Sequence, residues 1–216
     1  MVLKLDFEKA FDKIEHKVIL DILAHKGFGL KRRAWIESIL KSGTSEVLLN
    51  GVPRKTFHCR RGVRQGDPLS PLFFVLAADL LQSILNKAVQ HGLLRLPIPA
   101  PSSDFPVIQY ADDTLIILEA SATQIFFLKC VLQSFSDSTG LKINFSKSMM
   151  VPINLKIEKL NHLARTFGCQ TGSFPFTYLG LPMGLTRPKV DDFLTLISKC
   201  ERRLNYISPS SAKLAD

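Results

Sequence analysis

The sequence predicts an α+β fold in which helices back a mostly antiparallel sheet. Three observations favour it: strand and helix patterns alternate along the chain, several links between them resemble hairpins, and 46% of the 216 residues are hydrophobic. Hairpin links make neighbouring strands antiparallel, and a chain of this length and composition can bury a sizeable core. The length alone predicts one large domain, or one and a half.

The N-terminal third predicts a strand, two helices and a hairpin. Alternation of apolar and polar residues indicates the strand, helical spacing of apolar residues indicates the helices, and Asn50-Gly51 favours a type I′ turn. The second helix carries Trp35, the only tryptophan, on its apolar face, so we expect Trp35 in the core. In order, these elements cover residues 2–7, a helical pattern that ends at Gly27, residues 30–41, and strands at 47–49 and 56–59.

The remaining chain begins with a break rich in glycine and proline at residues 62–71. A long apolar helix follows, with the prolines near its first turn, where proline is tolerated. In order, the next elements are a helix over 72–90, a proline-rich loop over 92–104, two strands within 107–118, a helix over 122–136 that ends near Gly140, a strand over 141–148, a helix over 156–167, a strand or hairpin over 174–181, a helix over 189–206 and a polar tail over 208–216.

Charge and cysteine usage narrow the classes of partner. The net charge of +9 suggests a polyanionic partner, and residues 1–65 hold most of it, with 14 Lys and Arg against 7 Asp and Glu. Taken alone, such basic runs are more typical of a solvated face. The four cysteines form no C-x-x-C pair, which excludes a zinc ribbon and indicates reduced, intracellular thiols. No stretch looks long and apolar enough to span a membrane, so we expect no membrane partner.

Three aspartates carry the candidate chemistry. Asp6 ends the first strand, and Asp112 and Asp113 lie at the tip of a hairpin. Adjacent carboxylates repel each other, and a hard divalent cation such as Mg²⁺ prefers oxygen ligands. If the two strands are neighbours, these carboxylates could share two Mg²⁺ ions about 3.5–4 Å apart, as in-line phosphoryl transfer requires. We expect Asp113 to be the weaker ligand because adjacent strand residues face opposite ways. A solvated Asp-Asp turn is the competing interpretation.

Five segments together resemble the palm motifs of reverse transcriptases, in their order along the chain. They are most similar to those of non-LTR (LINE-type) retrotransposons, especially those of plants. The resemblance implies a polymerase palm with a ferredoxin-like (RRM-like) core over 1–187, residual fingers elements at about 28–60, and the start of a thumb with a tail over 188–216. The segments are Leu5–Asp12 (LDFEKAFD), Arg64–Pro71 (RQGDPLSP), Tyr110–Asp113 (YADD), Gly140–Ser148 (GLKINFSKS) and Tyr178–Pro182 (YLGLP).

The resemblance also implies an activity and roles for the matched residues. The activity is that of an RNA-directed DNA polymerase, which adds deoxynucleoside triphosphates to a DNA primer on an RNA template with two Mg²⁺ ions, or Mn²⁺ in their place. Phe11 would be the steric gate against a 2′-hydroxyl, and Lys147 the general acid for the pyrophosphate leaving group. The implied metal ligands are Asp6, the Phe7 carbonyl, Asp112 and Asp113; the substrate contacts are Phe7, Phe11, Arg64, Gln65 and Gly66; the primer grip is Tyr178, Leu179 and Gly180.

Several of these residues also have ordinary interpretations. Phe11 fits a core aromatic, Lys147 fits a solvated lysine, and aromatic packing alone could explain residues 178–181. Asp67 and Pro68 are expected to shape the turn into the following helix rather than contact substrate.

The sequence also departs from the family pattern. Counterparts of the fingers, of the upstream endonuclease and of most of the thumb are not recognised in it. We therefore expect an incomplete right-hand polymerase that keeps its metal ligands but is weakly active or inactive as an isolated chain, since catalysis also needs positioning. The alternatives are an inactive retroelement relic that at most binds nucleic acid and a group II intron-type reverse transcriptase. The resemblance further implies an intracellular, nuclear location.

Overall fold

A five-stranded sheet organises the computed structural model, which describes residues 1–98 and 104–207. The strand order is β6-β7-β1-β8-β9, so β1 lies at the centre, and every pair except β8 with β9 is antiparallel. This architecture confirms the predicted α+β class with a mostly antiparallel sheet. The strands are β1 (Val2–Leu5), β6 (Val107–Tyr110), β7 (Asp113–Ile117), β8 (Met149–Val151) and β9 (Gln170–Thr171).

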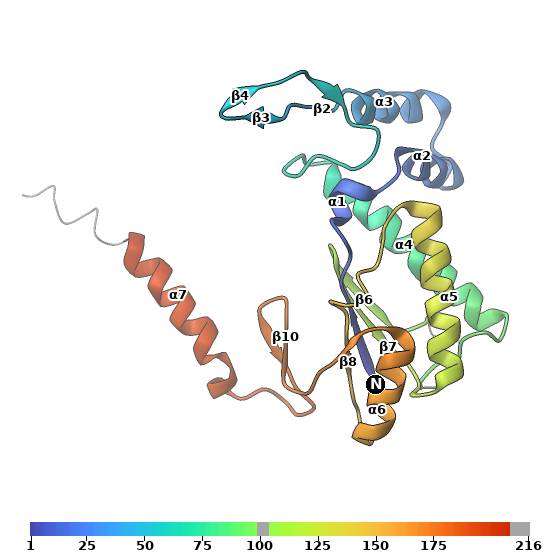
Figure 1. The fold of residues 1–216 in the computed structure, drawn as a ribbon, viewed down its shortest axis with the longest axis vertical. Coiled ribbons are helices and arrows are strands. Elements are labelled where there is room, and N and C mark those ends of the chain that lie inside the picture. Colours follow the sequence, from blue (N-terminus) through green and yellow to red (C-terminus); the bar gives the residue numbers. More distant parts are fainter. Residues whose placement is uncertain (99–103, 208–216) are drawn as a thin grey trace, which may run out of the picture.

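Helices line one side of this sheet and a short strand pair lies on the other, while further helices and short strand pairs lie beyond one of its ends (Figure 1). The final helix, α7, lies apart from it at the end of the described chain. The helices are α1 (Ala10–Lys13), α2 (His16–His25), α3 (Leu30–Lys41), α4 (Ser70–Gln90), α5 (Ala122–Thr139), α6 (Ile157–Phe167), the 3₁₀ helix η1 (Val190–Phe193) and α7 (Leu194–Ile207). The short strands are β2 (Thr44–Ser45), β3 (Leu48–Leu49), β4 (Val52–Pro53), β5 (Phe57–His58), β10 (Phe176–Tyr178) and β11 (Leu181–Met183).

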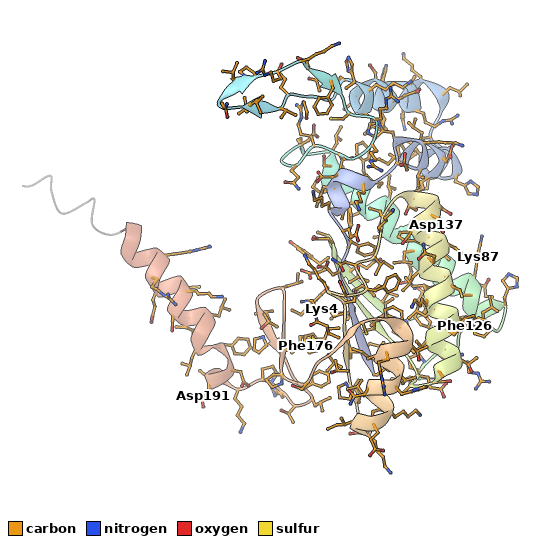
Figure 2. All side chains as sticks on the ribbon, viewed as in Figure 1. Lys4, Lys87, Phe126, Asp137, Phe176 and Asp191 are labelled. Carbon is orange, nitrogen blue, oxygen red and sulfur yellow. The ribbon has the colours of Figure 1, made fainter. Side chains whose placement is uncertain are left out.

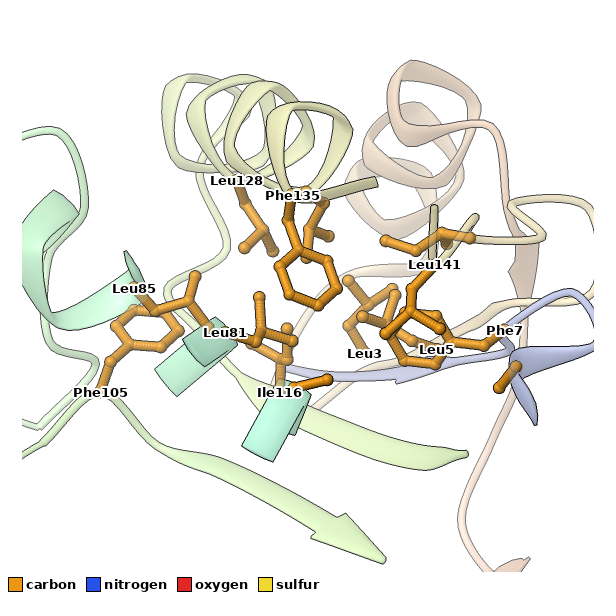
Figure 3. Close-up of a cluster of buried hydrophobic side chains, with 14 of the residues drawn as sticks. Leu3, Leu5, Phe7, Leu81, Leu85, Phe105, Ile116, Leu128, Phe135 and Leu141 are labelled. Atoms are coloured by element: carbon orange, nitrogen blue, oxygen red, sulfur yellow. The ribbon is translucent and has the colours of Figure 1, made fainter. Parts of the chain in front are cut away.

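Both faces of the central strand are covered, by different elements. Leu3 and Leu5 are buried in the main core, to which α4, α5 and α6 contribute their apolar faces (Figure 3). Val2 faces the other way, into a smaller cluster with Phe176 of the β10–β11 hairpin. Alternation along β1 therefore assigns odd positions to the helix side and even positions to the hairpin side. Lys4 follows this rule: it lies on the same side of the sheet as Phe176 (Figure 2), and its Nζ donates to the Thr177 carbonyl at 3.3 Å.

Trp35 is not a core residue, which corrects the expectation from its apolar neighbours. Its side chain is 60% exposed, whereas Leu40 is the buried residue of α3. The Nζ of Lys31 lies 5.4 Å from the centre of the indole ring, a cation–π arrangement on the helix surface. Helical spacing predicted the helix itself correctly, but it did not reveal how little of α3 is packed against the rest of the chain.

The predicted hairpin exists, but its outer strand pairs differently. Asn50 and Gly51 connect β3 to β4, and both have positive φ, as a type I′ turn requires. Residues 56–59 were expected to pair with 47–49; instead Phe57 and His58 pair with β2. The result is a long two-stranded ribbon made of the pairs β3–β4 and β2–β5, which we call the ribbon.

The predicted strand over residues 141–148 is wrong, because this segment forms a turn. Leu141 and Ile143 are buried as alternation suggested, and Ile143 makes an isolated bridge with Phe7. The side-chain oxygen of Asn144 then accepts hydrogen bonds from Ser146 Oγ and the Lys147 amide. Local bonds of this kind compete with a strand ladder. The strand begins only at Met149, in β8.

One sequence expectation about membranes is also corrected. By length and composition α4 could cross a bilayer. Its buried side chains, including Phe73, Ala77 and Leu81, belong to the main core. Asp79 on the same helix forms an ion pair with Lys26, the residue that follows α2. Hydropathy alone does not separate a helix packed in this way from a membrane span.

The other predicted helices over 72–90, 122–136, 156–167 and 189–206 are confirmed within a few residues. The loop over 92–104 lies partly, and the tail over 208–216 wholly, outside the described residues. The division of the chain at residue 187 stays a prediction.

Gly140 joins α5 closely to α1, and this contact gives a stability prediction. Gly140 caps α5 with φ +78°, and a Cβ built on it would lie 2.4 Å from the Lys13 carbonyl oxygen. Gly27 also has positive φ, +82°, but a Cβ there would have nothing within 4 Å. We expect Gly27→Ala to lower the free energy of unfolding by about 1–2 kcal/mol, and Gly140→Ala by about 1–3 kcal/mol more.

Urea denaturation followed by circular dichroism would measure both variants against the wild type. Equal losses in the two variants would mean that the approach of Gly140 to Lys13 is not a tight contact.

Candidate active site

The register of the sheet brings Asp6 and Asp113 to facing positions. The last pair of β1 with β7 is Leu5 with Thr114, so one step further along both strands Asp6 faces Asp113. Even positions of β1 lie on the hairpin side of the sheet, and their partners in β7 share that side. Both aspartates are half-buried. Two carboxylates from segments 107 residues apart therefore lie at one end of the sheet, the edge where β1 ends and β7 begins.

Asp112 lies beside this pair, in a loop rather than in a strand. Tyr110 pairs with Asp113, which leaves Ala111 and Asp112 as a two-residue connection between β6 and β7. Ala111 has φ +51°, and Asp112 is exposed. Asp113 was expected to be the weaker metal ligand because neighbouring strand residues face opposite ways. That argument does not apply here, because Asp113 lies in a strand and Asp112 does not.

The main chain of Asp6 is held by the turn at residues 144–148. The Asn144 amide donates to the Asp6 carbonyl at 2.8 Å, and the Asp6 amide donates to Ser148 Oγ at 3.1 Å. On the next residues, the Glu8 amide donates to the Lys142 carbonyl at 2.8 Å. The chain beyond β1 is thus paired with the segment before β8, although neither is in the sheet proper.

Phe7 and Phe11 are fixed by aromatic contacts on the helix side. The Phe7 ring is buried and meets Phe135 edge-on, with centroids 6.4 Å apart. The half-buried Phe11 ring stacks on Phe74 of α4, with centroids 5.4 Å apart and an angle of 23°. The Val63 amide donates to the Phe11 carbonyl at 2.6 Å, which docks the loop after the ribbon onto α1.

Arg64, Gln65 and Gly66 form an exposed turn next to this docked loop. Arg64 and Gln65 also line a cavity of about 430 Å³, whose wall includes Arg61 and the end of α3. Asp67 shapes the turn as predicted, because its Oδ1 accepts the Leu69 amide at 2.8 Å at the start of α4. The turn leaves the guanidinium and amide groups open to a ligand.

Lys147 is exposed on the turn that holds Asp6, with its charge near Glu8. Lys13 donates to Glu8 at 2.5 Å and is the main reason that the pKa of Glu8 is lowered. Lys142 and Lys147 lower the same pKa further by their charge. Lys13, Lys142 and Lys147 therefore gather around Glu8, two residues beyond Asp6.

The β10–β11 hairpin, which is the predicted primer grip, directly contacts the β6–β7 hairpin. We call the β6–β7 hairpin, which carries Asp112 and Asp113, the acidic hairpin. Leu179 and Gly180 form its two-residue tip, and the Tyr178 hydroxyl donates to the Asp113 carbonyl at 3.3 Å. Burial raises the pKa of Tyr178, and the charge of Asp113 raises it further. Tyr178 packs with Val2 on the hairpin side of the sheet.

The aspartates fit a divalent cation that a substrate helps to bind. Within residues 1–98 and 104–207 there is no cluster of three or more His, Cys, Asp and Glu side chains that could hold a metal alone. Mg²⁺ is typically bound by one or two carboxylates together with substrate phosphates, rather than by a cage of protein ligands. Asp6, Asp112 and Asp113 supply such oxygens, and among them only Asp113 approaches a cation, Lys4, at 3.9 Å.

Two contacts at this edge were not predicted from the sequence, the bond between Ser148 and Asp6 and the bond between Tyr178 and Asp113, which spans 65 residues. A serine after a lysine carries no distinctive pattern, so only the folded chain reveals its bond to Asp6.

Comparisons with known proteins agree with this arrangement. Residues 1–185 match the family described as reverse transcriptase (RNA-dependent DNA polymerase). The Pol polyprotein of the type-1 retrotransposable element R2 from Popillia japonica is 29% identical over 154 residues, which are 70% of this chain and 21% of that protein. The uncharacterized 149 kDa protein of transposon TX1 from Xenopus laevis is 26% identical over 201 residues, 92% of this chain and 15% of that protein. The chain thus spans about a fifth or less of these relatives.

A solved structure extends the likeness to the fold. Telomerase from Candida albicans, in complex with a fragment of telomeric RNA, superposes with a TM-score of 0.54 at 15% identity. The superposition covers 85% of this chain and 29% of that one. At this identity the likeness concerns the fold, which is that of a polymerase palm. Taken together, the sequence and the fold identify this chain as a member of the reverse transcriptase (RNA-dependent DNA polymerase) family, of the kind found in non-LTR retrotransposons.

Proposed function

We propose that this chain acts as the palm of an RNA-directed DNA polymerase, which adds deoxynucleotides to a primer 3′-hydroxyl on an RNA template. The observation that carries the proposal is the facing position of Asp6 and Asp113, with Asp112 beside them at the tip of the acidic hairpin. Nucleotidyl transfer is largely a matter of positioning and charge stabilisation, and these carboxylates supply the ligands for it.

Divalent metal ions are used by reverse transcriptases, and here two Mg²⁺ ions would be held by Asp6, Asp112 and Asp113, with the Phe7 carbonyl as a further ligand. When bound, such ions activate the attacking hydroxyl and stabilise the leaving oxygen. The protein's own part is to keep these oxygen atoms at one edge of the sheet through the β1–β7 register.

Other residues would orient the substrates around this edge. Phe11, fixed against Phe74, would occupy the space that a ribose 2′-hydroxyl needs. Gln65 and Arg64 would border the nascent base pair, and Tyr178 would align the primer end through its hairpin. Lys147 is exposed and free to reach the pyrophosphate, so it would serve as the general acid.

Positive charge near the site supports a nucleic-acid template. Residues 28–65, which contain α3 and the ribbon, have nine Lys and Arg against two Glu. Such a surface attracts phosphates without reading sequence. The telomerase of similar fold was solved in complex with a TWJ fragment of telomeric RNA, so a protein of this fold binds RNA.

Replacing a metal ligand tests the activity directly. We expect Asp112→Asn to lower dTMP incorporation on poly(rA)/oligo(dT) at least about 100-fold in Mg²⁺, since bound metal contributes several kcal/mol to the transition state. Asp137→Asn is the matched control, because Asp137 is an exposed aspartate of α5 that accepts a hydrogen bond from Gln133. Circular dichroism would verify that both variants keep the fold.

The same assay separates an enzyme from an inactive relic. It would be run with the chain alone and with the chain fused behind the fingers segment of a related retrotransposon polyprotein. Incorporation that depends on Asp112 in either protein supports the proposal. If neither protein incorporates nucleotide, or if Asp112→Asn keeps full activity, the proposal is wrong.

The steric gate predicts a change in sugar selectivity. In an active protein, Phe11→Val should lower the preference for dTTP over UTP at least about tenfold, because a smaller side chain leaves room for the 2′-hydroxyl. The preference is measured as the ratio of kcat/KM values for the two nucleotides. Phe126→Val, at an exposed aromatic of α5, is the control. An unchanged ratio in Phe11→Val would remove the gate assignment.

The basic surface predicts salt-dependent binding. Affinity for the poly(rA)/oligo(dT) duplex should fall at least about tenfold between 50 and 200 mM KCl, because each neutralised phosphate releases counterions. Fluorescence anisotropy with a labelled primer gives the dissociation constants. Binding that hardly varies with salt would contradict a contact with the phosphate backbone.

A further inference from the structure

Asp6 is the first residue beyond the ladder of the central strand. β1 ends at Leu5, and β8 pairs only with residues 2–4 of it. The main-chain groups of Asp6 therefore have no partner in β8 and bond to the turn at residues 144–148 instead. The carbonyl accepts from the Asn144 amide, and the amide donates to the side chain of Ser148.

The Ser148 hydroxyl accepts one hydrogen bond and donates another, and together these bonds link Asp6 to the turn. Its Oγ accepts the Asp6 amide at 3.1 Å and donates to the Asn144 carbonyl at 2.8 Å. The side chain is fully buried, with 0% exposure, so water does not replace either bond. A hydroxyl can accept and donate at once, which a methyl group cannot do and a thiol does only weakly.

The turn that contains Ser148 is closed on itself. The Ser148 amide also donates to the Asn144 carbonyl, at 3.0 Å, and the Asn144 side chain accepts from the Lys147 amide at 3.2 Å. The turn is thus a rigid unit, and its outer position is Lys147. Asn144 and Ser148, at the two ends of this turn, bond to the main chain of Asp6, and Lys147 lies between them.

We propose that Ser148 is a positioning residue for Asp6, which holds the carboxylate at its place opposite Asp113. The direction of an aspartate side chain follows its main-chain torsions, and Ser148 fixes the amide on one side of Asp6. Partners that orient a metal ligand affect metal binding without touching the metal. This inference rests on the proposed function, because it matters for catalysis only if Asp6 holds a metal ion.

The first test measures amide hydrogen exchange by NMR on the full chain. In Ser148→Ala, the Asp6 amide should exchange at least about tenfold faster relative to the Leu3 amide, since a buried donor has lost its acceptor. Ser148→Cys keeps a side chain of similar size with a weak acceptor and should show the same direction of change. Unchanged exchange at Asp6 in a folded variant would overturn the proposal.

Thr139→Val is the matched control for general damage. Thr139 is also fully buried, and its Oγ1 also links a carbonyl and an amide, those of Phe135 and Leu141. It does not contact Asp6. We expect Thr139→Val to lower stability as Ser148→Ala does but to leave the exchange of the Asp6 amide unchanged. Equal acceleration at Asp6 in both variants would overturn a specific role for Ser148.

The second test measures binding of the Mn²⁺–dTTP complex by electron paramagnetic resonance, because substrate phosphates help to hold the ion. The apparent dissociation constant should rise about 10- to 100-fold in Ser148→Ala and stay at the wild-type value in Thr139→Val. Asp6→Asn separates the two proposals. If Asp6→Asn loses Mn²⁺ but Ser148→Ala binds it as the wild type does, only the role of Ser148 is wrong. If Asp6→Asn keeps wild-type affinity, the metal assignment fails, and this inference fails with it.

Discussion

The candidate site depends on one constraint, the central place of β1 between two antiparallel neighbours. β7 fixes which residue faces Asp6, and β8 fixes where the ladder stops, so that the next residue is free to bond elsewhere. A slip of one residue in either register would turn Asp6 toward the helix side, because side chains alternate along a strand. Burial of Leu3 and Leu5 among the helices opposes such a slip.

The elements around β1 cover the helix side of the sheet fully but leave the hairpin side partly exposed near Asp6 and Asp113. Helices α4, α5 and α6 fill the helix side with apolar side chains, and the β10–β11 hairpin covers only part of the opposite side. The carboxylates consequently remain half-buried or exposed, as ligands for a hydrated ion must be. The contacts of Tyr178 and Ser148 reach this edge from two later segments of the chain, so the edge is assembled from sequence-distant parts.

Much of this could be predicted from the sequence, because the decisive patterns were local. Alternation identified β1, β-favouring residues on both sides of Asp112 and Asp113 identified the β6–β7 hairpin, and helical spacing identified α4, α5 and α6 within a few residues. Asp6 was expected to meet Asp112 and Asp113 if their strands are neighbours, and the β1–β7 register shows that these strands are neighbours. The functional roles of the individual residues are still predictions.

What could not be predicted depended on tertiary contacts. Helical spacing gave α3 an apolar face, but nothing local indicates that Trp35 stays 60% exposed. Alternation in residues 141–148 could not reveal that Asn144 closes a turn on itself, and Asn50-Gly51 fixed one strand pair of the ribbon without fixing the other. For the ribbon the deciding partner, β2, lies outside the window that a local pattern covers. At residues 144–147 the partners are local, but apolar and polar alternation does not report side-chain bonds to the main chain.

The ribbon has a consequence for the behaviour of the protein in solution. It has few strand partners, and Leu48 and Val52 are more than half exposed, so its free edges can accept a strand from another molecule. Arg54 and Lys55 put positive charge on the same ribbon, and like charge keeps two copies apart at low ionic strength. Added salt screens this repulsion. The conditions that release a polyanion from the protein are therefore those that favour its self-association.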